Sequence, residues 1–395
     1  MKSKVAIVQC DAYGREGIER AVEKAVDLLG GPAQFIRPGA KVLVKPNLCL
    51  AEAPGNFITT HPEIVRKIVL MCNAAGAKTI VGDNPVGEAD KSRLNDIWET
   101  TGIASILEGI EHERSFLDQV MTAYSIRIKE KDYSFYVSRE ALSMNLVINV
   151  PKFKTHTLMT LTGAVKNLYG LLPGNSKKKL HSELSVQEDF AALLADIYNL
   201  VRPGLNIMDA VIGLEGDGPG AQGDVRKIGL ILAGNDGIAL DSIAARLMNL
   251  EPRRILTNRI GGEKGYGETD LNKIEILGED PEKYIMKDFK LPVTFRYNSE
   301  LTHKIFSLSR TYVKINPDKC IRCGLCAANC PAAAITINGT GAVINQEPCI
   351  SCMTCQEICP QAAVYCERSP FYLQIRNLKS RNTGNKKKEE INSDK

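Results

Sequence analysis

The sequence predicts an α/β fold with a mostly parallel, doubly wound sheet, followed by a small α+β domain that is rich in cysteine. Two observations favour the first part. Apolar runs of strand length alternate with segments of helical periodicity, and four of these runs end in charged or amide side chains. The second part follows from cysteine placement, because nine of the 12 cysteines lie between Cys320 and Cys366.

The N-terminal segment alternates strand and helix in a βαβαβ pattern. Residues 4–10 form a β-rich run, and residues 17–29 carry apolar side chains at helical spacing until Gly30-Gly31-Pro32 ends the helix. A strand at 41–44, a helix at 62–75 and a strand at 78–81 follow. Strands that are joined through helices run parallel, so we expect helices on both faces of a parallel sheet.

The remaining elements continue this pattern with one interruption. Residues 90–140 are mixed, and two alternating segments at 124–128 and 133–137 predict a hairpin. We expect strands at 146–150, 205–209, 228–232 and 274–277, and helices at 94–101, 159–171, 186–201 and 236–250. The predicted parts are an α/β domain at 1–290, a connector at 291–312, the cysteine-rich domain at 313–367, and a basic, disordered tail at 368–395.

Each half of the cysteine-rich domain reads C-x₂-C-x₂-C-x₃-C-P. This spacing is typical of bacterial ferredoxins with two clusters, in which each run lends its fourth cysteine to the other cluster. A zinc site would more often show two CxxC pairs, and a disulfide framework suits a small secreted domain. The sequence therefore predicts a ferredoxin-like domain with two [4Fe–4S] clusters. The ligands are Cys320, Cys323, Cys326 and Cys359 for the first cluster, and Cys349, Cys352, Cys355 and Cys330 for the second.

Composition excludes several classes of protein. The net charge is +4, and residues 379–395 hold six Lys/Arg against three Asp/Glu, so the rest of the chain is almost neutral and lacks a basic nucleic-acid footprint. Met1 is followed almost directly by a predicted strand, so we expect no signal peptide, and no apolar run is long enough to predict a transmembrane segment. Cysteine ligands of iron–sulfur clusters suit a reducing compartment, so we expect a cytoplasmic protein.

Polar side chains follow four of the predicted strands, at the edge where ligands bind in open α/β sheets. The four exits predict one polar cleft that takes an anionic small molecule. The expected binding residues are Lys45, Asn47, Lys152 and Lys154, with Lys166 and Asn167 on a following glycine-containing helix; the candidate catalytic residues are His156, Asp83 and Asp209. The alternative is that these lysines are solvated surface residues.

Several other residues receive a structural interpretation. The glycine-rich turn at 213–220 matches neither the P-loop nor the GxGxxG pattern, so it gives little support for a nucleotide site. His61 lies at a predicted helix start, where Thr60 is the expected cap. We expect Cys10, Cys49, Cys72 and Cys366 to be small apolar residues, and His112, His181 and His303 to lie on the surface.

Several short motifs occur together along the first part of the chain: KPN at 45–47, TTHPE at 59–63, GDNP at 82–85, PKFKTH…TGAVKNLYGLLPG at 151–174, DAVIGLEGDGPG at 209–220 and AGND…ALD…AARL at 233–247. As a set, these segments resemble domain-of-unknown-function family 362. The resemblance covers roughly residues 4–290. Members of this family often carry a ferredoxin-like module, so the resemblance implies the fold and the order of the modules, but no general activity.

Two classes of function remain open. The first is an iron–sulfur oxidoreductase that passes electrons between its clusters and an anionic substrate or cofactor in the α/β domain. The second is a non-catalytic electron carrier or maturation factor whose large domain docks a partner. Both need a redox partner protein as electron donor or acceptor. The converging polar strand ends favour the enzyme, and the missing nucleotide or flavin pattern favours the carrier.

Overall fold

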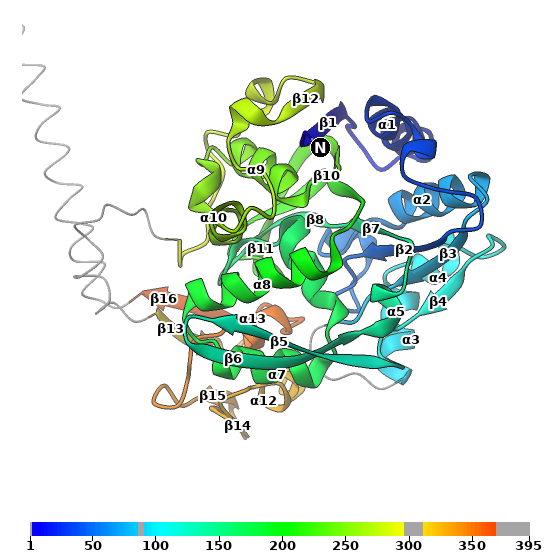
Figure 1. Ribbon diagram of the computed structural model, residues 1–395. Helices are drawn as coiled ribbons and strands as arrows, with labels where there is room; N and C mark the ends of the chain where they lie inside the picture. Colours follow the sequence, from blue (N-terminus) through cyan, green and yellow to red (C-terminus); the bar gives the residue numbers. More distant parts are fainter. Residues whose placement is uncertain (1, 86–90, 296–310, 369–395) are drawn as a thin grey trace, which may run out of the picture.

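The computed structural model describes residues 2–85, 91–295 and 311–368. Its centre is a ten-stranded sheet in which the strand order along the main path is β12-β1-β11-β10-β7-β2-β3-β4 (Figure 1). The strands of this path are β1 (Lys4–Gln9), β2 (Lys41–Pro46), β3 (Lys78–Gly82), β4 (Glu113–Ser115), β7 (Leu146–Val150), β10 (Leu205–Gly216), β11 (Gly223–Gly234) and β12 (Glu275–Gly278). Only β11 runs antiparallel to its neighbours on this path, so the sheet is mostly parallel, as expected.

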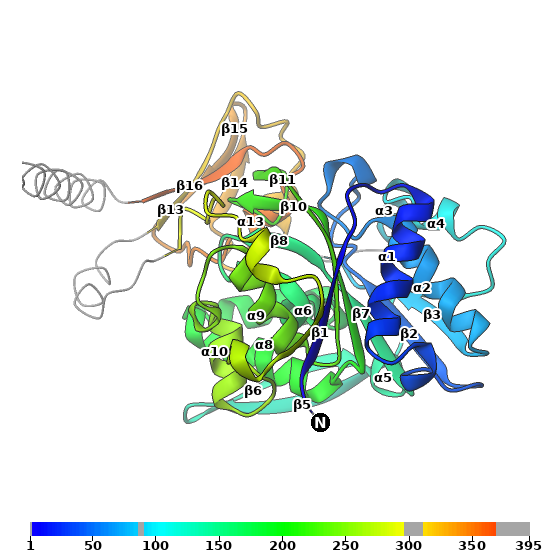
Figure 2. The same ribbon diagram turned by 90° about the horizontal axis from the view of Figure 1, so that it is seen from above.

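Helices cover both faces of the sheet, which confirms the α/β fold (Figure 2). Helices α1 (Arg15–Leu28) and α2 (Pro62–Ala74) pack on one face against Val42 and Val44. The side chain between these two valines, Leu43, points to the other face, where it packs with α8 (Gln187–Val201). Helix α9 (Gly237–Leu247) covers β1 on that second face. The alternation along β2 thus buries successive apolar side chains in two different cores.

The start of α2 differs from the expected one. His61, not Thr60, is the N-cap residue, and its Nδ1 accepts a hydrogen bond of 3.3 Å from the backbone N–H of Glu63. The hydroxyl of Thr60 is turned into the sheet, where it donates to the carbonyl of Val150 at 2.7 Å. It also accepts from the backbone N–H of Asn47 at 2.8 Å. Thr60 therefore ties together two strand ends instead of capping the helix.

The predicted helix at 159–171 is wrong. This segment consists of the short strand β9 (Thr160–Leu161), helix α6 (Gly163–Asn167) and a 3₁₀ turn, Leu168–Leu171. Thr160 and Gly163 have φ angles of 69° and 52°, which no continuous α-helix contains. Strand β9 pairs with β8 (Lys152–His156), which in turn pairs with β10. The chain therefore folds back over the sheet's carboxyl edge before α6 begins.

Other elements lie near their expected positions. The predicted hairpin is present as β5 (Met121–Ile128) and β6 (Lys131–Ser138), paired with each other in a sheet of their own. The remaining α-helices of this part are α3 (Lys91–Thr100), α4 (Ile103–Ile106), α5 (Arg139–Leu142), α7 (Gly174–Glu183) and α10 (Leu256–Glu263). Among the described residues, no helix has both the length and the apolar character needed to cross a membrane.

The small C-terminal domain is built from two similar halves around the cysteines. Its elements are the strand pairs β13 (Thr311–Ile315) with β16 (Val364–Arg368) and β14 (Ile335–Asn338) with β15 (Gly341–Ile344), and the helices α12 (Leu325–Ala328) and α13 (Thr354–Glu357). Cys366 is buried beside Met353, in agreement with an apolar role. The predicted connector and tail extend beyond the described part of the chain, because 296–310 and 369–395, including His303, lie outside it.

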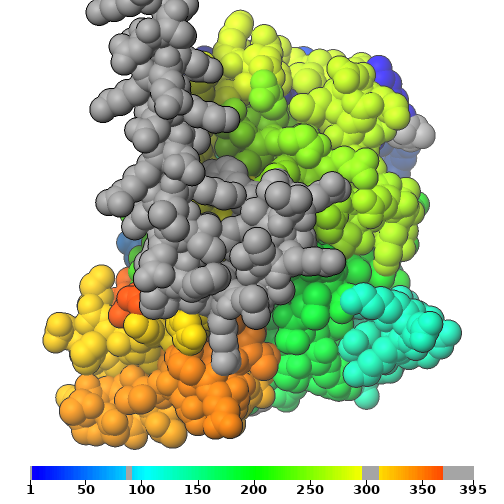
Figure 3. Space-filling view, turned by 90° about the vertical axis from the view of Figure 1, so that its left-hand side faces the viewer, coloured from blue at the N-terminus to red at the C-terminus, as the bar shows by residue number. Residues whose placement is uncertain are grey.

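The small domain packs directly on the α/β domain (Figure 3). The contact is made by the turn that joins β10 to β11. Gln222 in this turn donates hydrogen bonds to the carbonyls of Ala362 and Val364. In the other direction, Gln356 of α13 donates to the carbonyl of Asp217 at 2.9 Å. The glycine-rich turn at 213–220 therefore belongs to the contact between the two domains.

Candidate functional site

The cysteines of the small domain form two neighbourhoods that exchange their fourth member. Burial raises the pKa of the Cys326 thiol, and nearby Cys323, Cys359 and Cys320 raise it further. Cys359 belongs to the second run in the sequence but lies with the first three cysteines in space. This grouping is the one expected from interleaved ligation of the first cluster.

The second neighbourhood is built in the same way. Burial raises the pKa of Cys355 well above its usual value, and the thiols that raise it most are Cys352, Cys349 and Cys330, with Cys326 of the first group a smaller influence. Cys330 comes from the first run. Both exchanges therefore have the geometry that the repeat predicts, and the assignment of ligands to individual clusters remains a prediction.

The surroundings of these cysteines fit a [4Fe–4S] cluster. Cys320, Cys323, Cys326 and Cys359 line one hollow together. The backbone N–H of Ala363 donates to Cys359 Sγ at 3.4 Å, as hydrogen bonds to cluster sulfurs do. Among the described residues, no three His, Cys, Asp or Glu side chains converge as ligands of a single metal ion. The four cysteine ligands of a [4Fe–4S] cluster each bind a different iron, so they are farther apart than the ligands of a single metal ion.

A second hollow lies where the two domains meet; we call it the interdomain pocket. Its α/β wall includes Asn47, Cys49, Asp83, Lys154, Thr162, Lys166, Asn167, Lys177 and His181. The small domain contributes Asn329, Thr354 and Glu357. Asn329 and Thr354 directly precede Cys330 and Cys355 in the sequence. One wall of the pocket is therefore formed by residues adjacent to expected cluster ligands.

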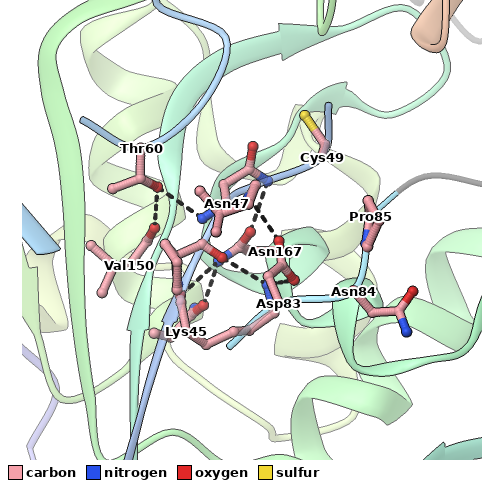
Figure 4. A network of polar contacts seen from close by, with 12 residues as sticks. Lys45, Asn47, Cys49, Thr60, Asp83, Asn84, Pro85, Val150 and Asn167 are labelled. Atoms are coloured by element: carbon pink, nitrogen blue, oxygen red, sulfur yellow. Dashed lines mark hydrogen bonds and ion pairs between the residues drawn. The ribbon is translucent and has the colours of Figure 1, made fainter. Parts of the chain in front are cut away.

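Lys45 and Asp83 form a buried ion pair in which Asp83 belongs to the pocket wall and Lys45 lies outside it (Figure 4). Lys45 Nζ lies 2.7 Å from Asp83 Oδ1 and donates to the carbonyl of Pro46 at 3.0 Å. Burial lowers the pKa of Lys45, and Asp83 opposes this change. Oδ2 of Asp83 accepts from the backbone N–H of Leu48 at 2.8 Å. Because the pair is satisfied internally, Lys45 supports the pocket wall and does not enter the pocket.

Asn167, the last residue of α6, is hydrogen-bonded to asparagines at two strand ends. Asn47 Nδ2 donates to Asn167 Oδ1 at 2.8 Å, and Asn167 Nδ2 donates to Asn149 Oδ1 at 2.8 Å. Gly170 then passes so close that a Cβ there would lie 2.2 Å from Asp83 Oδ1. The glycine is therefore required by the close approach of the backbone to the ion pair.

The three basic residues of β8 point to three different places. Lys152 Nζ lies 2.7 Å from Asp209 Oδ2 and 2.6 Å from the hydroxyl of Tyr13, which donates to Asp209 Oδ1 at 2.7 Å. Lys152 and Asp209 are both fully buried. Lys154 Nζ instead reaches Asn47 Oδ1 at 2.9 Å. The four polar strand ends thus divide between the pocket and a separate buried cluster around Asp209.

His156 lies behind Glu357 and does not line the pocket. Its Nδ1 accepts from the backbone N–H groups of Leu158 and Met159 at 3.0 and 3.2 Å, which places the ring proton on Nε2. Nε2 lies 2.7 Å from Glu357 Oε1. Burial lowers the pKa of His156 to about 4, so the neutral form predominates at neutral pH. The candidate proton donor can therefore act on the pocket only through Glu357.

Glu357 and Lys166 face each other across the pocket. Burial alone would raise the pKa of Glu357, but Lys166, His156 and His181 together lower it below its usual range. Lys166 has no hydrogen bond or ion pair within the described residues, whereas the other pocket lysines are engaged. Lys177, for example, donates to the carbonyls of Asn84 and Pro85 at 2.7 and 2.8 Å. Burial lowers the pKa of Lys177 to about 7. Lys166 is thus the uncommitted cation of the pocket.

The sequence did not single out several residues of this pocket. His181, expected at the surface, is 6% exposed and stacks on Phe190 with ring centroids 4.5 Å apart. Burial lowers its pKa to about 4. Glu357 lies between Cys355 and Cys359 of the second run, and the spacing of the cysteines does not indicate a role for it. Cys49 follows KPN by one residue, and that proximity is the signal that could have found it.

Comparisons with known proteins agree with this architecture. The family model described as "Domain of unknown function (DUF362)" matches residues 42–246, and the "4Fe-4S dicluster domain" matches residues 312–360. The thylakoid-associated protein sll1697 of Synechocystis sp. is 29% identical over 296 residues, which cover 74% of this chain and 88% of that protein.

A solved structure, the lactate racemase apoprotein from Thermoanaerobacterium thermosaccharolyticum, aligns with a TM-score of 0.33 and 12% identity. The aligned part covers 53% of this chain and 50% of the racemase, so the chain spans half the length of that protein. This likeness is too distant to compare sites. The family match extends over more than half of the chain, and together with the dicluster domain it leads to one conclusion: this is an iron–sulfur protein that belongs to the DUF362 family.

Proposed function

We propose that this protein is an iron–sulfur oxidoreductase, in which two [4Fe–4S] clusters pass electrons between a redox partner protein and an anionic ligand in the interdomain pocket. The observation that carries the proposal is the composition of the pocket. One wall holds the uncommitted ammonium group of Lys166, and the opposite wall holds Thr354 and Glu357 beside expected cluster ligands. A ligand bound to Lys166 would therefore lie next to the second cluster.

The residues of the chain have distinct tasks in this proposal. When bound, the clusters supply one-electron transfer, and the protein must supply binding and protons. Lys166 binds the anionic group through a charge-assisted hydrogen bond. The neutral ring of His156 donates its Nε2 hydrogen to the carboxylate of Glu357 and so positions this carboxylate at the pocket wall. Lys45, Lys152, Asp83 and Asp209 keep the strand ends in place. We further propose a cytoplasmic location, because cluster ligands require reduced thiols.

The test begins with protein purified without oxygen. We expect about eight irons and eight acid-labile sulfides per chain, and an anionic small molecule that co-purifies and is identified by mass spectrometry. Clusters reduced with a slight excess of dithionite should be reoxidised when this molecule is added, as followed by their visible absorption. Lys166→Gln should keep the cluster spectrum but lose reoxidation, whereas Lys179→Gln, which removes an exposed lysine of α7, should behave as wild type.

The same experiment also tests a second candidate function. A non-catalytic electron carrier or maturation factor agrees with the absence of a nucleotide or flavin pattern in the sequence, and the Synechocystis relative is named for its association with thylakoids. In that case a protein partner, and no small molecule, would reoxidise the clusters. Zinc in stoichiometric amount without sulfide would contradict both functions.

A further inference from the structure

Cys49 differs from the other cysteines that are not expected cluster ligands. Cys10, Cys72 and Cys366 are 5%, 0% and 7% exposed and lie in apolar cores. Cys49 is partly exposed and lines the interdomain pocket. Cys49 packs against a small apolar cluster, but it is not fully buried as a core residue would be. The structure describes all twelve cysteines. Cys49 is the one that lies outside the two cysteine runs and also lines this pocket.

The surroundings of Cys49 are electropositive. Lys154 Nζ lies 3.3 Å from Cys49 Sγ, and its other hydrogen bonds, to Asn47 Oδ1 at 2.9 Å and to the carbonyl of Ile58 at 2.8 Å, hold it in this position. Burial lowers the pKa of Lys166, and a thiolate at Cys49 opposes this change, so the two groups interact across the pocket. Partly exposed cysteines beside fixed ammonium groups are typical of reactive thiolates.

A second observation points to a ligand at this place. Oγ1 of Thr162, a residue that is 4% exposed and lines the same pocket, has no hydrogen-bond partner among the described residues. Lys166 also lacks a direct partner there. A buried hydroxyl without a partner is costly, and a hydroxyl together with a free ammonium group is a suitable donor set for one carboxylate. The other pocket lysines are already engaged, which disfavours a polyphosphate.

We propose that Cys49 is a nucleophile that captures a small electrophilic carboxylate, with the carboxylate group bound by Lys166 and Thr162. The thiolate electron pair forms the new S–C bond, and the electron pair of the bond that breaks at the same carbon departs with the leaving group. The inference rests on the proposed function for the anionic nature of the pocket ligand, but this step requires no electron from the clusters. It therefore adds a covalent site to the pocket.

Iodoacetate and iodoacetamide test this site, since both alkylate thiolates with release of iodide and only the first carries a carboxylate. Oxygen-free protein with its clusters bound is treated with each reagent, and labelled peptides are quantified by mass spectrometry. Cys49 should be labelled first. Its preference for iodoacetate over iodoacetamide should exceed that of free cysteine in the same buffer by about tenfold to a hundredfold, the size of one charge-assisted hydrogen bond. Added salt should reduce this preference.

Variants separate the two parts of the inference. Lys166→Gln should slow alkylation by iodoacetate about tenfold or more and leave iodoacetamide within about twofold. Lys179→Gln should change neither rate, and Cys49→Ala should remove the fast reaction. Labelling of Cys49 no faster than buried Cys10, or the same reagent preference as free cysteine, would overturn the proposal. Selective alkylation together with clusters that no anion reoxidises would keep the capture site and reject the oxidoreductase.

Discussion

Replacing Lys152 by methionine should destabilise the protein strongly, although the same change at Lys166 should not. The sequence assigns both lysines to one anion-binding cleft, and the structure gives them different roles. Lys152 neutralises the charge of Asp209, which is fully buried. The two residues are opposite each other on the adjacent strands β8 and β10. Without Lys152, the carboxylate of Asp209 keeps the hydroxyl of Tyr13 at 2.7 Å and the backbone N–H groups of His61 at 3.0 Å and Val211 at 3.4 Å, but no positive charge among the described residues pairs with it.

The magnitude follows from the cost of an unpaired buried charge. Removing one partner of a buried ion pair lowers the free energy of unfolding by about 3–5 kcal/mol. Lys152→Met combined with Asp209→Asn removes both charges, and should recover at least half of the loss. Lys166 has no ion-pair partner in the described part of the chain, so Lys166→Met should change stability by less than about 1 kcal/mol.

Trp98 provides the assay. It is the single tryptophan of the chain, is 2% exposed and lies in α3, so its fluorescence reports on the α/β domain. Urea unfolding without oxygen gives the free energies for each variant. Lys179→Met, at a lysine with a 55% exposed side chain, is the matched control and should stay within about 0.5 kcal/mol of wild type. If Lys152→Met does likewise, the structural role of the Lys152–Asp209 pair is refuted.

Three more outcomes test other parts of the structure. Cys359→Ala should lower the iron content from about eight to about four per chain, because it removes a ligand of the first cluster and leaves the second intact; loss of all iron or of none would reject the interleaved assignment. Burial lowers the pKa of His181 to about 4 from 6.5, so the unfolded state binds the extra proton between these values and stability is lost as the pH falls. His181→Asn should reduce this loss by about 3 kcal/mol in urea titrations, and an unchanged pH profile would contradict the burial of a neutral ring. Gly170→Ala should lower the unfolding free energy by about 1–3 kcal/mol, since its Cβ would lie 2.2 Å from Asp83 Oδ1, and a stability equal to wild type would show that this close approach is absent.

The sequence predicts well what depends on local spacing. The repeated cysteine runs identify the iron–sulfur domain, since ligand spacing is imposed by the cluster itself, and the βαβαβ pattern identifies the sheet. The polar strand ends also lie at one edge. The sequence does not predict that these polar side chains divide into a pocket group and a buried group, because the division depends on which side chains pair with each other in space. Lys152 and Asp209 have opposite charges on adjacent strands, and they neutralise each other before any ligand is considered.

The pocket itself depends on contacts that are distant in sequence. Glu357 and Lys166 line the same pocket only because the small domain packs on the turn between β10 and β11. His181 lies on α7, a helix that the sequence did not predict, and the predicted helix at 159–171 concealed the fold-back that positions Thr162 and Lys166. The periodicity of apolar residues predicts neither the position of His181 nor the fold-back before α6.

The wall that the small domain contributes to the interdomain pocket should couple the binding of the clusters to the binding of a ligand in the pocket. Thr354 and Glu357 stand in the short segment between expected cluster ligands, and a segment of this kind is ordered largely by the metal that its cysteines bind. Occupancy of the pocket should therefore favour retention of iron and sulfide, and loss of iron should weaken the hold on the small molecule by the same factor. On the proposed function, a shortage of iron would therefore also lower the occupancy of the pocket by its anionic ligand.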